Sequence, residues 1–60
     1  MERKEALRIA QTAIEKRMDY ETLKYSDDLY GREDSVDDVW VYVEECESIG
    51  KIAFDRKYNL

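Results

Sequence analysis

The chain has 60 residues, one cysteine and no histidine; 42% of its residues are charged, and the net charge at pH 7 is −5. This length allows one small domain, over residues 1–60, with a marginal core. Cys46 has no second cysteine for a disulfide, and without histidine the usual Cys/His zinc sites are excluded. We therefore expect no metal and no cofactor, and stability must come from efficient packing or from self-association.

The charges are segregated along the chain into three blocks. Residues 1–18 carry five Lys/Arg against three Asp/Glu, residues 19–48 carry two against eleven, and residues 49–60 carry three against one. The middle segment, which we call the acidic block, thus has a net charge of −9, and each end has +2. Repulsion within the acidic block opposes compaction, so a basic partner surface or a need for solubility would account for it. A pI near 4.6 predicts no direct binding of nucleic acid.

The first predicted element is a helix over residues 2–18. Its mostly apolar stripe recurs at steps of three and four residues, and the segment has no glycine or proline. The stripe is formed by Ala6, Leu7, Ala10, Ala13, Ile14, Arg17 and Met18. This pattern is unlike the apolar centre of a signal peptide, and no apolar run reaches the length of a membrane span. With a lone free thiol, we expect a cytoplasmic protein that does not bind membranes.

Residues 19–35 allow two interpretations. Tyr20, Leu23 and Tyr30 fit one face of a short helix that ends before Gly31. Leu23 and Tyr25 equally fit one face of a short strand, with a turn at residues 27–28. Residues 32–35 are predicted as a loop or a helix cap.

Residues 36–54 decide the fold, and they too have two interpretations. As a helix, the segment would be capped by Ser35 and would end at Gly50. Its buried stripe would contain Val36, Val39, Trp40, Val43 and Cys46. As a hairpin, residues 39–43 are five consecutive β-branched or aromatic residues, and residues 51–55 form the second strand. We prefer the hairpin, because five apolar residues in a row would surround a helix that so small a domain has little room to bury.

The predicted fold is therefore α+β, an N-terminal amphipathic helix packed on a small antiparallel sheet, with a three-helix bundle as the alternative. This order of a helix, a strand bearing Trp40 and a strand over residues 50–55 resembles PepSY-type modules over half of the chain. We assign no function from the resemblance. In the hairpin, Val39, Val41 and Val43 point to one face, whereas Trp40 and Tyr42 point to the other.

No residue pattern indicates catalysis. There is no histidine to serve as a base, and the serines lack a glycine-rich elbow. Adjacent carboxylates such as Asp37 and Asp38 usually point apart, so they are expected to form a solvated surface. We predict no catalytic residue and no enzymatic activity.

Two functions of different classes remain. The first is a small acidic interaction module that inhibits or regulates a protein with a basic surface, steered by charge and held by aromatic side chains. Its predicted contact residues are Asp37, Asp38, Trp40, Tyr42, Glu44 and Glu45. The alternative is a homodimeric structural or accessory protein without a separate ligand, in which an apolar face pairs with itself.

Overall fold

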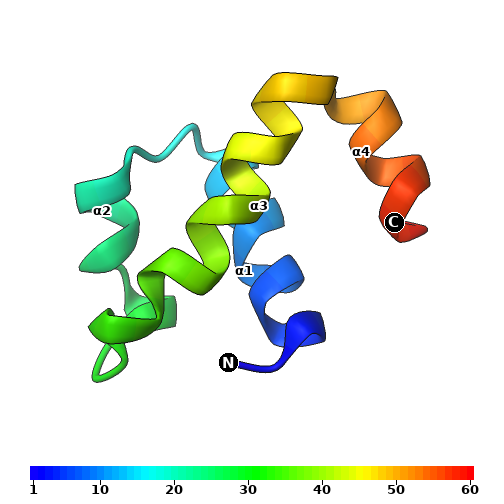
Figure 1. Ribbon diagram of the computed structural model, residues 1–60. Helices are drawn as coiled ribbons and strands as arrows, with labels where there is room; N and C mark the ends of the chain where they lie inside the picture. Colours follow the sequence, from blue (N-terminus) through cyan, green and yellow to red (C-terminus); the bar gives the residue numbers. More distant parts are fainter.

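The computed structural model describes all 60 residues and arranges them around one central helix (Figure 1). The elements are α1 (Arg3–Glu15), α2 (Tyr20–Lys24), the 3₁₀ turns η1 (Asp27–Leu29) and η2 (Glu33–Ser35), α3 (Val36–Ile49) and α4 (Lys51–Tyr58). Helix α3 packs against α1, α2, η2 and α4, and its largest contact is with α1. Figure 1 shows α3 crossing α1, with α2 on one side and α4 on the other. The position of α3 therefore decides which surfaces of the molecule are exposed.

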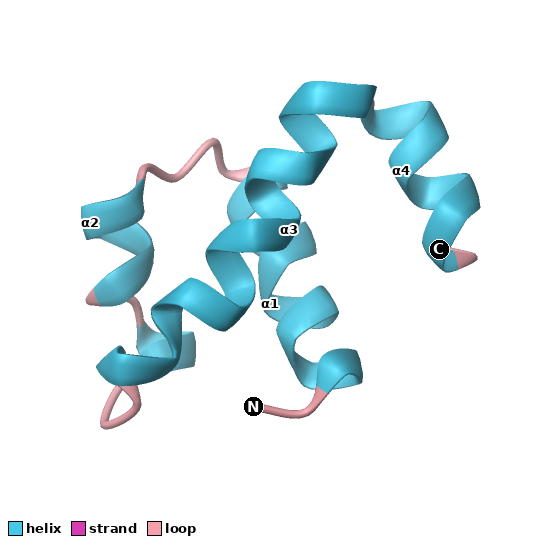
Figure 2. Ribbon diagram, in the orientation of Figure 1, coloured by secondary structure: helices cyan, strands magenta, loops and turns pink.

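The α+β prediction is wrong. Figure 2 shows helices and loops and no strand, and residues 36–54 form α3 and the first half of α4. The three-helix bundle, which was the alternative, fits, with the short α2 added beside it. The PepSY-type order of elements is lost along with the hairpin, since neither of its strands exists.

Helix α3 forms because its apolar residues recur with the period of a helix, even though several of them are of types that favour a strand. Its buried residues are Val36, Val39, Val43 and Cys46, at spacings of three and four. These four belong to the stripe that the helical interpretation predicted, and Trp40 is half-buried at its edge. From the sequence we expect too little room to bury a helix that is apolar all round. Of residues 39–43, however, only Val41 is left largely exposed, at 55%. One exposed valine is a small penalty, so the tertiary stripe overrides the local preference for a strand.

The prediction of a helix over residues 2–18 is confirmed in type, although α1 is shorter at both ends. The chain leaves the helix at Arg17, whose φ of 54° lies in the left-handed region. The amide of Met18 donates to the carbonyl of Ala13 at 2.9 Å, which is the closing bond of a Schellman motif. The buried side of α1 is rich in alanine, which lets the backbone of α3 approach closely.

Of the two interpretations of residues 19–35, the helix is confirmed and the strand is wrong. Asp19 caps α2 by accepting a hydrogen bond from the amide of Thr22 at 2.8 Å. Leu23 is buried and Tyr30 is exposed, and the φ of Gly31 is 76°. The helix interpretation thus predicted the element and a left-handed Gly31, but α2 ends at Lys24, so it does not include Tyr30 and Gly31 does not cap it.

Two clusters of buried side chains make up the core. The larger one joins α1, α2, η1 and α3 through Ala6, Ile9, Ala10, Ala13, Leu23, Leu29, Val36, Val39 and Val43. The smaller one consists of Leu7, Cys46 and Phe54, and it holds α4 against the rest of the molecule. Ile14 and Tyr42 are half-buried and pack against both clusters. None of the helices is both long and apolar enough to cross a bilayer.

Gly50 is the single residue between α3 and α4, and its backbone conformation suits glycine alone. Its φ of 90° and ψ of 152° lie in a region that side-chain-bearing L-residues essentially do not occupy. An added Cβ would meet no atom within 4 Å, so the cost of a substitution comes from the backbone and not from a clash.

Replacing Gly50 by alanine is expected to lower the free energy of unfolding by about 1–3 kcal/mol, because the corner then holds a strained L-residue. Urea denaturation followed by circular dichroism measures the loss. A synthetic chain with D-alanine at position 50 is the matched control, since a D-residue is at ease with positive φ. Equal losses for L- and D-alanine would contradict a backbone origin.

Candidate protein-interaction surface

The exposed side of α3 is a narrow stripe formed by Asp37, Val41, Glu44 and Ser48. These positions lie three and four residues apart, so they share one face of the helix. We call them the outer stripe. It places an exposed valine between two carboxylates, opposite the side that packs on α1.

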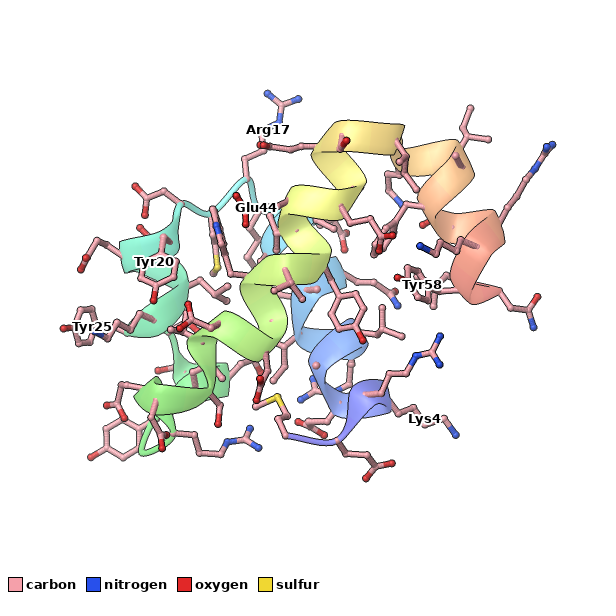
Figure 3. All side chains as sticks on the ribbon, in the orientation of Figure 1. Lys4, Arg17, Tyr20, Tyr25, Glu44 and Tyr58 are labelled. Carbon is pink, nitrogen blue, oxygen red and sulfur yellow. The ribbon has the colours of Figure 1, made fainter.

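Trp40 lies along one edge of the outer stripe, facing α2. Its ring packs edge-to-face on Tyr20, with ring centroids 5.6 Å apart and an interplanar angle of 89°. The hydroxyl of Tyr20 donates to the Oδ1 atom of Asp37 at 2.9 Å. This hydrogen bond to the carboxylate raises the pKa of Tyr20. Tyr20 therefore fixes both Asp37 and Trp40 in place, and Figure 3 shows it on the α2 side of α3.

Tyr42 lies on the other side of α3, facing α4. Its ring packs edge-to-face on Tyr58 at a centroid distance of 5.4 Å. Glu45 accepts hydrogen bonds from Lys57 and from the hydroxyl of Tyr58. These bonds, that from Lys57 above all, lower the pKa of Glu45. Tyr42 and Glu45 thus attach α4 to α3.

The structure divides the six predicted contact residues into two groups. Asp37, Trp40 and Glu44 belong to the outer stripe and its α2 edge, as Figure 3 shows for Glu44. Tyr42 and Glu45 are occupied by α4, and Asp38 binds the amino group of Met1 at 3.1 Å. The hairpin interpretation placed Trp40 and Tyr42 on one face, but residues two apart on a helix point to nearly opposite sides.

Sequence reasoning missed two residues of this surface, Tyr20 and Val41. Tyr20 follows the capping residue Asp19, which would have indicated the first turn of a helix. Val41 falls four residues after Asp37, a spacing that has meaning only in the helical interpretation.

Most carboxylates of the acidic block have no cationic partner within the molecule. Of its eleven, only Asp28, Asp38 and Glu45 lie within 4 Å of a positively charged nitrogen. The other eight are Asp19, Glu21, Asp27, Glu33, Asp34, Asp37, Glu44 and Glu47. Such an excess of uncompensated charge sets up a negative potential over α2, α3 and the turns between them.

This surface contains neither a cluster of metal-ligating side chains nor an exposed thiol. No three metal-ligating side chains come together. The thiol of Cys46 is buried, and this burial raises its pKa, which lowers the fraction of reactive thiolate. The outer stripe instead offers carboxylates, an exposed valine and the edge of a held tryptophan. No family model, curated protein or solved structure matches this chain.

Proposed function

We propose that this chain is a non-enzymatic interaction module that binds a protein with a basic surface through the outer stripe of α3 and regulates that protein. The observation that carries the proposal is the pair of exposed carboxylates without ionic partners, Asp37 and Glu44, on either side of Val41. We place this activity in the cytoplasm, where a lone buried thiol stays reduced.

The uncompensated carboxylates supply long-range attraction. Negative potential over α2 and α3 raises the rate at which a basic protein meets the outer stripe, and it orients that protein before contact. Salt weakens this effect because mobile ions screen exposed charges over about 8–10 Å.

Val41 and Trp40 supply short-range attraction. Val41 is free to be covered, and tryptophan is enriched among the residues that dominate binding energies. Because Tyr20 already holds the indole of Trp40, little side-chain entropy is lost when a partner packs on it.

The proposal is tested with the partner itself. The chain is immobilised, a lysate of its source is passed over it, and bound protein is eluted with a salt gradient. The rate of association of the eluted protein is then measured over a range of ionic strengths. We expect a basic protein whose association slows as salt increases. A rate that does not change with salt would refute the proposal.

Two charge-reversal variants test whether the partner binds at the outer stripe. Glu44→Lys and Glu15→Lys produce chains of equal net charge, and both glutamates are exposed and lack an ion-pair partner. We expect Glu44→Lys to slow association about tenfold and Glu15→Lys to change it less than about twofold, since Glu15 lies on α1. Equal effects would show that net charge alone, and not the outer stripe, drives binding.

A further inference from the structure

Two isoleucines are exposed at the corner between α3 and α4. Ile52 is 75% exposed and Ile49 is 43% exposed, and Ala53 beside them is exposed as well. They border a shallow hollow that is also lined by Lys51 and Arg56. No other part of the chain covers this apolar surface.

A half-open apolar groove adjoins the corner. It has a volume of about 440 Å³ and lies between the end of α1, the end of α3 and the start of α4. Its apolar lining consists of Ala13, Ile14, Met18, Val43 and Cys46. Lys51 borders both this groove and the hollow beside Ile52, so the two form one continuous surface.

The rim of the groove carries opposite charges that are not paired with each other. Arg17 has no carboxylate within 4 Å, and Glu47 has no cation. Lys51, the third charged residue of the rim, already binds Asp55 at 2.9 Å. A surface with one free cation and one free anion is complementary to a second copy of itself, because each charge meets its opposite across a two-fold axis.

The position of the groove also suits a contact between copies. Each chain has a net charge of −5, so two copies repel each other over most of their surfaces. Apart from Glu47, the charged residues of the corner and the rim come from the two basic ends of the chain. Figure 3 places Arg17 at the same end of the molecule as this corner. Contact here brings only one unpaired carboxylate of the acidic block, that of Glu47, to the interface.

We propose that the chain forms a two-fold symmetric dimer through this corner. Ile52 of each copy lies in the apolar groove of the other, and each Arg17 faces Glu47 of the other copy. Burying an isoleucine twice supplies the main attraction. The inference does not depend on the proposed function, because the corner and the groove share no lining residue with the outer stripe.

Sedimentation velocity over a range of chain concentrations tests the dimer. We expect the mass to rise from 7.2 kDa to twice that value as concentration increases. Ile52→Asp should raise the dissociation constant of the dimer at least about 100-fold, since it removes a central apolar contact and buries a charge. Tyr30→Asp is the matched control, because Tyr30 is 85% exposed and lies in the distant loop after η1. It should leave the dissociation constant within about twofold.

A charge exchange tests the symmetry. Glu47→Arg should weaken the dimer about tenfold, because it sets two cations opposite each other. Adding Arg17→Glu to the same chain should restore the dimer to within about threefold of the original. A wild-type chain that stays monomeric would overturn the proposal and assign the corner to another occupant. A dimer that withstands Ile52→Asp, or a double variant as weak as the single one, would overturn it too.

Discussion

Replacing Val39 by aspartate is expected to leave the chain unfolded at neutral pH. Val39 is fully buried in the larger core cluster, between α1 and α3. An isolated carboxylate there must either remain charged in an apolar site or take up a proton, and both cost several kcal/mol. A core of this size supplies only about 3–5 kcal/mol in total. Far-UV circular dichroism should therefore show the loss of helix.

Val41→Asp is the matched control for this experiment. The two valines lie two residues apart on α3, but Val41 is 55% exposed on the outer stripe. We expect this variant to keep its helical spectrum and to have a free energy of unfolding within about 0.5 kcal/mol of that of the original chain. In a hairpin both valines would face the same side, so equal effects of the two changes would contradict the helical fold.

Replacing Phe54 by alanine is expected to remove most of the stability of the chain, because truncating a buried phenylalanine usually costs about 3–5 kcal/mol and a core of this size supplies no more than that in total. Phe54 is 1% exposed and joins Leu7 and Cys46 in the smaller cluster. It also contacts Tyr58, with ring centroids 5.0 Å apart. Its removal takes away the main attachment of α4. Urea denaturation in dilute solution measures the change.

Ile52 provides the comparison on the same helix. Ile52→Ala is expected to change the free energy of unfolding of the monomer by less than about 0.5 kcal/mol, because the side chain is 75% exposed. A loss as large as that of Phe54→Ala would mean that the two residues share a buried face, as in the rejected hairpin.

The parts of the fold that could be predicted are those in which local and periodic signals agree. In α1, alanine-rich composition and apolar spacing both favour a helix. At Gly50, the end of the helix in the alternative interpretation is also the end of the periodic stripe. Over residues 39–43 the signals conflict, because β-branched residues occupy positions that equally suit a helix. Only the packing of Val39 and Val43 on α1 resolves the conflict, and a sequence does not display that contact.

The candidate site was predictable in its charges but not in its geometry. The unpaired carboxylates of Asp37 and Glu44 follow from the excess of acids in the acidic block. Trp40 and Tyr42 lie on opposite sides of α3, and the side chains that hold them there come from distant parts of the chain. Tyr20 lies seventeen positions before the Asp37 that it contacts, and Tyr58 lies thirteen after Glu45. No local sequence pattern shows that Trp40 borders the outer stripe while Tyr42 packs on α4.

The division of the core into two clusters has a consequence for how the molecule opens. The cluster around Phe54 shares no buried residue with the larger one, so α4 can detach while α1, α2 and α3 stay packed. Such an independently opening unit is a foldon, with a lower opening free energy than the rest of the chain. Phe54, which packs on Leu7 and Cys46, and Tyr58, which packs on Tyr42, are the side chains of α4 that couple the two units. The cooperativity of the whole 60-residue chain therefore depends on the few side chains through which α4 contacts α1 and α3.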